Sequence, residues 1–171
     1  GNINKEFVKQ FIVKNEVING KSIDILPSEL SLSKMLEYCR TVSMAHTLLK
    51  RIIDTVKDSY DFVILDLPPN SGMAIEMSLY ASDKVILATD CDDNTKEGIE
   101  VTLEGIKSYN EVVDKNLMVD TCFISKYNKK VGVNNFVRDK IIDILTNNGL
   151  FKENIRTIPF NYVIPESQKD A

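Results

Sequence analysis

A carboxylate stands at the end of the most apolar short segment of the chain. Residues 62–65 read Phe-Val-Ile-Leu, and Asp66 follows them directly. An unbroken apolar run with a β-branched centre predicts a strand buried on both faces, which we place at residues 61–66. In open α/β sheets, ligands bind beyond the carboxyl ends of the strands. Asp66 is therefore a candidate to hold a Mg²⁺-bound water beside a nucleotide phosphate, although an aspartate that only caps the next turn would leave the same pattern.

Two prolines come soon after this carboxylate. Pro68 and Pro69 cannot donate a backbone hydrogen bond, so they prevent the strand from simply continuing. The segment after Asp66 is expected to turn away from the sheet.

The rest of the chain alternates between the period of strands and the period of helices. Short apolar runs predict strands at residues 22–27, 84–88, 117–125 and 155–158. Apolar residues at helical spacing predict helices across residues 45–56, 71–81, 95–113 and 133–149. Strands that alternate with helices indicate right-handed crossovers. The predicted fold class is α/β, with a mostly parallel sheet and helices on both faces.

Composition is consistent with one ordinary domain spanning residues 1–171. The net charge of −4 gives no global attraction to nucleic acid. The three cysteines, Cys39, Cys91 and Cys122, fit neither a zinc spacing nor a disulfide framework, and we expect free thiols in a cytoplasmic protein. The run from Asp90 to Asp93 resembles a metal cluster, but capping of the helix that follows it is a simpler explanation, although Asp90 also ends a strand on the expected nucleotide side.

Several motifs then occur in a single order. They are Ile-Asp-Ile-Leu-Pro-Ser at residues 23–28, Tyr-Asp-Phe-Val-Ile-Leu-Asp-Leu-Pro-Pro at 60–69, Glu-Gly-Ile at 97–99, and Ile-Pro-Phe-Asn at 158–161 with Glu166 five residues on. In this order they resemble the middle and C-terminal part of a ParA/Soj-type chromosome or plasmid partitioning ATPase. This family belongs to the deviant Walker P-loop ATPases, which also include MinD.

The resemblance implies a fold and a set of ligands. The fold would be P-loop NTPase-like, a Rossmann-type three-layer arrangement that is incomplete here. The cofactors would be ATP and Mg²⁺, and the protein would form a homodimer in an ATP-dependent way. Its partners would be a ParB-like protein and DNA of any sequence, with no membrane, and its location would be cytoplasmic and nucleoid-associated.

The resemblance also implies roles for particular residues. Asp66 resembles the Walker B carboxylate, and Pro68 with Pro69 resembles the turn into a nucleotide-responsive switch. Ser125, Pro159 and Asn161 stand where the family contacts adenine. The alternative is that Pro159 serves merely to end a strand and Asn161 merely to form a turn.

A small basic cluster follows the predicted strand at residues 117–125. Lys126, Lys129 and Lys130 lie near the position of a DNA-contacting arginine in the family. So few lysines are equally compatible with an ordinary solvated loop.

The chain departs from the family in two important respects. It contains seven glycines, well separated from one another, and no glycine-rich phosphate loop, and it lacks the family's second strand, which ends in Asp-x-Asp-Pro-Gln. We therefore expect an internal or C-terminal fragment of a longer ATP hydrolase, itself inactive. The alternative is a MinD-like membrane-associated positioning ATPase, or a non-catalytic regulator on the same fold. An intact phosphate loop ahead of residue 1 would favour an ATPase over a regulator.

The absence of that loop has a structural consequence for the predicted strand at residues 61–66. The strand that feeds the phosphate loop lies beside it in the family, so one edge would be left unpaired. We expect the chain to self-associate, to be marginally stable, or to fill the gap with its own residues 6–13.

Overall fold

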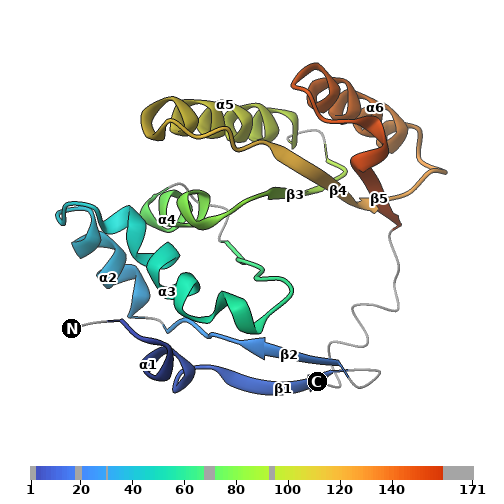
Figure 1. The fold of residues 1–171 in the computed structure, drawn as a ribbon. Helices are drawn as coiled ribbons and strands as arrows, with labels where there is room; N and C mark the ends of the chain where they lie inside the picture. Colours follow the sequence, from blue (N-terminus) through green and yellow to red (C-terminus); the bar gives the residue numbers. More distant parts are fainter. Residues whose placement is uncertain (1–2, 18–20, 30, 68–71, 93–94, 160–171) are drawn as a thin grey trace. The chain divides into compact units, whose positions relative to one another are not determined.

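The computed structural model describes residues 3–17, 21–29, 31–67, 72–92 and 95–159 (Figure 1). The chain divides into two compact units, Gly1–Ser82 and Asp83–Ala171. Each unit is described by itself below.

The first unit contains a β-hairpin whose strands are held by a polar triad. Strand β1 (Val13–Val17) pairs antiparallel with β2 (Lys21–Ile25), and Lys14 lies opposite Asp24. The Lys14 ammonium and the Tyr60 hydroxyl both donate to Oδ2 of Asp24, the hydroxyl at 2.7 Å. The hydrogen bond from Lys14, and then the one from Tyr60, hold the pKa of the Asp24 carboxyl below its usual value. The triad fastens the hairpin to the segment in which Tyr60 lies.

The helices of the first unit pack around a small apolar cluster. The helices are α1 (Lys5–Lys9), α2 (Leu32–Cys39), α3 (Leu48–Val56) and α4 (Met73–Ala81), with short 3₁₀ turns at Ala45–Thr47 and Lys57–Ser59. Cys39, Ala45 and Met77 are buried at the centre of this cluster. The predicted helix at 45–56 is confirmed as a 3₁₀ turn followed by α3, and the helix predicted at 71–81 is confirmed over α4.

The predicted strand at residues 61–66 is wrong. Residues 62–67 belong to no helix or strand, and Phe62 and Ile64 are 87% and 83% exposed. Among the described residues, no strand pairs with this segment. Apolar and β-branched composition favours a strand only where a neighbouring strand supplies hydrogen bonds and a packing surface.

Residues 6–13 do not fill the edge of that segment either. Glu6 lies in helix α1, and Val13 begins β1, which pairs with β2. The chain satisfies its N-terminal backbone locally, in a helix and a hairpin, so that part of the expectation is wrong. Self-association and marginal stability remain predictions.

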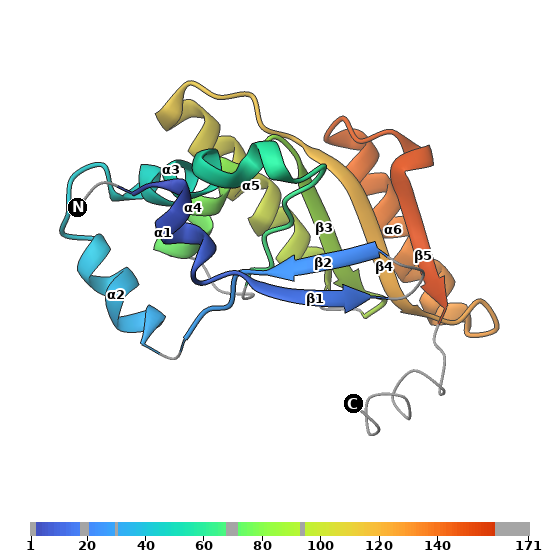
Figure 2. The ribbon, with the colours of Figure 1, turned by 60° about the horizontal axis from the view of Figure 1, so that its bottom comes forward.

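The second unit is built on a three-stranded parallel sheet. The order is β3 (Val85–Asp90), β4 (Val119–Tyr127) and β5 (Ile155–Pro159). Helices α5 (Thr95–Val113) and α6 (Gly132–Asn147) lie side by side on one face of this sheet, and a 3₁₀ turn (Lys152–Asn154) precedes β5 (Figures 1 and 2). The α/β class, with a parallel sheet flanked by helices, is confirmed.

Alternation along β4 and helical spacing along α6 create the core of this unit. Cys122 and Ile124 point to the same face of β4 and are fully buried. Ile141 and Leu145, one helical turn apart on α6, are also fully buried. Burial raises the pKa of the Cys122 thiol to about 11, which keeps this side chain protonated and apolar in character at neutral pH.

The predicted end of the α6 helix is confirmed at Gly149. This glycine has a φ of 90°, which L-residues with a side chain rarely adopt. The Leu150 amide donates to the Leu145 carbonyl at 3.0 Å, and the Gly149 amide donates to the Thr146 carbonyl at 3.1 Å. This is the Schellman arrangement, and it returns the buried Leu150 to the core beside Leu145.

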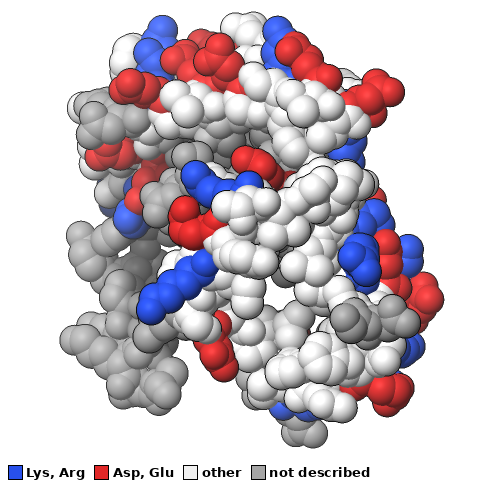
Figure 3. All heavy atoms as spheres, turned by 90° about the vertical axis from the view of Figure 1, so that its left-hand side faces the viewer, with Lys and Arg blue, Asp and Glu red and all other residues white. Residues whose placement is uncertain are grey.

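The exposed side of helix α5 carries charges of both signs. The exposed charged residues of this helix are Lys96, Glu97, Glu100, Glu104, Lys107 and Glu111. Acidic and basic side chains both lie along the upper rim of Figure 3. Mixed charges of this kind are typical of a solvated helix face. Within the described residues, no helix is long and apolar enough to span a bilayer.

The core of the second unit depends on Leu145. Leu145→Ala removes a fully buried side chain and should lower the free energy of unfolding by about 2–5 kcal/mol, measured by urea denaturation. Val112→Ala on α5, where Val112 is 83% exposed, is the matched control and should change it by no more than about 0.5 kcal/mol. Equal effects of the two substitutions would contradict this description of the core.

Candidate functional site

Polar side chains meet where strands β3 and β4 end. Because these strands are parallel and pair Asp90 with Ser125, their carboxyl ends lie at one edge of the sheet. Lys126 is the next residue along β4. This edge is where open α/β folds bind ligands.

Three of these groups form one hydrogen-bonded cluster. The Ser125 hydroxyl donates to Oδ1 of Asp90 at 2.6 Å and also lies 3.1 Å from the Thr89 carbonyl oxygen. The Lys126 ammonium pairs with Oδ2 of Asp90 at 2.5 Å. The Lys126 ammonium, and then the Ser125 hydroxyl, hold the pKa of the Asp90 carboxyl below its usual value. Both carboxylate oxygens of Asp90 are therefore engaged.

The backbone at this edge is also specific. Lys126 has a φ of 54°, in the left-handed region that residues with a side chain seldom adopt. The Cys91 amide donates to the Ser125 carbonyl at 3.0 Å, which extends the pairing one residue beyond β3. The Thr95 hydroxyl donates to the Asp90 carbonyl at 3.0 Å and joins the start of α5 to the same edge.

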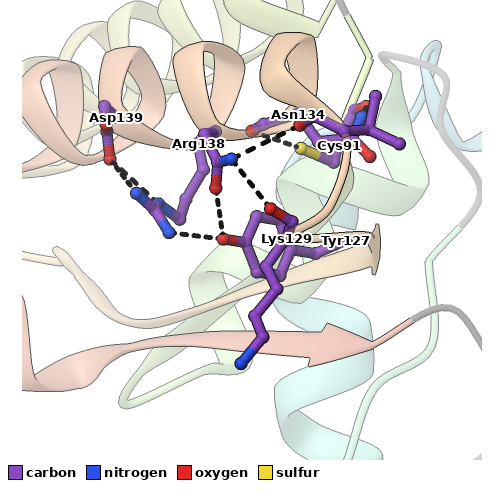
Figure 4. Close-up of polar contacts among 8 residues, drawn as sticks. Cys91, Tyr127, Lys129, Asn134, Arg138 and Asp139 are labelled. Atoms are coloured by element: carbon purple, nitrogen blue, oxygen red, sulfur yellow. Dashed lines mark hydrogen bonds and ion pairs between the residues drawn. The ribbon is translucent and has the colours of Figure 1, made fainter.

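A second network fixes the end of β4 against α6 (Figure 4). The Tyr127 hydroxyl donates to Oδ1 of Asn135 at 2.6 Å and accepts from the Arg138 guanidinium at 2.5 Å. The guanidinium also lies 5.2 Å from the centre of the Tyr127 ring and pairs with Asp139 at 2.7 Å. Arg138 is thus held by an aromatic ring and a carboxylate.

Asparagine side chains brace the loop between β4 and α6. Asn134 donates to the Cys91 carbonyl at 3.2 Å and accepts from the Asn128 amide at 3.2 Å. Asn135 donates to the Lys129 carbonyl at 3.0 Å. Figure 4 shows the Lys129 side chain extending away from α6. The loop backbone is therefore held in place while Lys129 and Lys130 are exposed.

The structure brings together some of the predicted site residues. Ser125 and Lys126 lie at one edge of the sheet, and Pro159 ends β5 in register with Tyr127. Asp66 is exposed in the first unit, in a segment without regular structure. Pro68, Pro69 and Asn161 lie outside the described residues.

The sequence places Asp90 at the end of a strand on the expected nucleotide side, but it favours helix capping as the role of this residue. The contacts of Asp90 with Ser125 and Lys126 are the part that sequence reasoning missed. The bonds from Tyr127 to α6 left no comparable signal, because polar side chains such as Asn135 and Arg138 are ordinary on a solvated helix.

The described residues offer little to a metal ion by themselves. They contain no group of three or more His, Cys, Asp or Glu side chains placed to hold one. Asp66 supplies one exposed carboxylate. A single carboxylate fits Mg²⁺ only where phosphate oxygens and waters complete the coordination, which is the usual manner of nucleotide-bound magnesium.

Comparison with known proteins shows the family to which this chain belongs, the AAA domain family. The AAA domain family matches residues 2–119. The sporulation initiation inhibitor protein Soj of Bacillus subtilis is 25% identical over 130 residues, which cover 71% of this chain and 51% of that protein. The chromosome-partitioning ATPase Soj of Treponema pallidum is 29% identical over 82 residues, covering 48% and 32% of the two chains. The chain spans about half the length of the first of these curated relatives.

Two solved structures share the fold. The structure of apo McdA from Cyanthece has a TM-score of 0.76 at 14% identity, covering 96% of this chain and 67% of that one. A plasmid partition protein from Borrelia burgdorferi has a TM-score of 0.67 at 21% identity, covering 97% and 69%.

The network around Tyr127 provides a direct test of this site. Tyr127→Phe removes the hydroxyl that joins Asn135 to Arg138, and should lower the free energy of unfolding by about 1 kcal/mol. It should also speed hydrogen exchange at the amides of residues 128–131. Tyr38→Phe, at a side chain that is 66% exposed, is the matched control and should change neither quantity. Unaltered exchange in Tyr127→Phe would show that the network does not hold the loop.

Proposed function

The chain belongs to the AAA domain family and is of the ParA/Soj type, and we propose that it forms part of an ATPase that partitions plasmids or chromosomes. The observation that carries this proposal is the family match, which spans residues 2–119. The likeness to McdA and to a plasmid partition protein supports it at the level of the fold.

The nucleotide would bind at the carboxyl edge of the sheet. Ser125 and Pro159 would contact adenine, and their positions at the ends of β4 and β5 support this assignment. Asn161 would complete the base contact, and Pro68 with Pro69 would form the turn into the switch segment. Asp66 would hold Mg²⁺ through water. When bound, the cation would supply positive charge that neutralises the phosphates of ATP.

The remaining assignments concern partners. Lys129 and Lys130 would contact DNA phosphates without reading the base sequence. The family resemblance implies the same contact for Lys126. Dimerisation on ATP, a ParB-like partner and a cytoplasmic, nucleoid-associated location belong to the same proposal. Because the 171 residues contain no glycine-rich phosphate loop, we propose that they do not turn over ATP alone.

The nucleotide role of Asp66 is testable in a longer protein that carries a phosphate loop ahead of this chain. Asp66→Ala should lower the rate of ATP hydrolysis about 100-fold or more, because Mg²⁺ would lose its protein carboxylate. Asp61→Ala removes another exposed carboxylate from the same segment and is the matched control. If the rate of ATP hydrolysis were unchanged in both Asp66→Ala and Asp61→Ala, Asp66 would not belong to the nucleotide site.

The DNA role of the loop is testable in the chain as it is. Replacing Lys129 and Lys130 together by Gln should weaken binding to duplex DNA of random sequence. It should also reduce the slope of log affinity against log salt by about 2, since about one counterion is released for each phosphate contact. Lys152→Gln, at another exposed lysine of the same unit, should leave the slope unchanged. If both variants left the salt slope unchanged, Lys129 and Lys130 would belong to an ordinary solvated loop that does not contact DNA.

A further inference from the structure

The three lysines predicted to contact DNA are not equivalent in the structure. Lys126 pairs with Asp90, and its side chain is 63% exposed. Among the described residues, no carboxylate lies within ion-pair distance of Lys129 or Lys130, both of which are exposed. The loop therefore presents two available ammonium groups and a third that is neutralised.

The pairing of Lys126 is specified by more than its own flexible side chain. The Ser125 hydroxyl binds the other oxygen of Asp90 and so fixes the orientation of the carboxylate. The register of β3 on β4 places Asp90 directly beside Ser125. The left-handed backbone at Lys126 sets the direction in which its side chain leaves the strand. Strand register, hydroxyl and backbone together direct the ammonium to Asp90.

The negative charge of Asp90 has a second effect on the same surface. Its side chain is 45% exposed, so its field reaches solvent beside the loop. A phosphate that approaches Lys126 would be repelled by this carboxylate, because the two would lie within the screening length of about 8 Å at physiological salt. The pair is exposed enough that its strength is modest, and removing Asp90 should release Lys126 without unfolding the unit.

We infer that Asp90 is a positioning residue that masks Lys126 from polyanions, so that of these three lysines only Lys129 and Lys130 contact DNA phosphates. This inference rests on the proposed DNA-binding function. It corrects the equal weight given to the three lysines and assigns a role to a carboxylate that the resemblance leaves unassigned. The Asp90–Lys126 pair would then limit the affinity of the loop for DNA.

The test is a double-mutant cycle on the 171-residue chain with random-sequence duplex DNA. Asp90→Asn should raise affinity about two- to fivefold, the range expected for loss of an exposed ion pair. It should also steepen the salt slope by about 1, through one added phosphate contact. Lys126→Gln alone should leave the salt slope unchanged, because it removes no phosphate contact, and should lower affinity only modestly, because it leaves the Asp90 carboxylate unpaired. In the double variant, the gain from Asp90→Asn should disappear.

Two further measurements separate pairing from general charge effects. Asp143→Asn makes the same charge change at an exposed aspartate on α6 and should leave the salt slope unchanged. Competitive acetylation with acetic anhydride, read by mass spectrometry, reports the ion pair without DNA. Lys126 should react several times more slowly than Lys129 in the original chain, and at a similar rate in Asp90→Asn.

Each outcome separates the inference from the function beneath it. If Lys129 and Lys130 carry the salt slope but Asp90→Asn leaves it unchanged, the masking is overturned and the DNA function stands. A fall of the salt slope in Lys126→Gln equal to the fall in Lys129→Gln would also overturn the masking. If no variant binds DNA, the proposed DNA function fails and the inference fails with it, whatever the acetylation rates show.

Discussion

The parallel pairing of β4 with β3 and β5 is the constraint on which the second unit depends. This pairing puts Cys122 and Ile124 on one face of β4, beneath the helix that supplies Ile141 and Leu145. The same register brings the carboxyl ends of all three strands to one edge. The polar cluster at that edge is thus a consequence of how the core is paired, since a one-residue slip of β4 would turn its buried side chains outward.

The local spacing of apolar residues predicted most elements, because a helix and a buried strand each leave a characteristic pattern of apolar residues in the sequence. The helix at 133–149 was found from its apolar spacing and from the glycine that ends it. The segment at 61–66 shows the limit of this reasoning. Its composition is that of a buried strand, yet residues 62–67 remain outside any sheet. Strand formation depends on a neighbour that is distant in sequence, and composition does not report whether one is present.

The same limit applies to the site. Resemblance singled out Ser125, Lys126 and Pro159, and the fold places them along the ends of adjacent strands. It could not reveal that Asp90 binds both Ser125 and Lys126, because that contact follows from register across 35 and 36 positions of sequence. The resemblance also did not reveal the antiparallel pairing of β1 with β2, although the sequence predicts a strand at residues 22–27.

Family membership and local geometry therefore decide different questions about this chain. The family match and the relatives support the proposed class of activity, and the motifs of this chain occur in the order that the resemblance requires. The number of positive charges available to a polyanion is set by this chain's own ion pairs. A lysine beside a fixed carboxylate and a lysine on a braced, exposed loop have the same formal charge, but they offer different contacts to a phosphate. A count of basic residues consequently overstates the binding surface wherever strand register supplies an acidic partner.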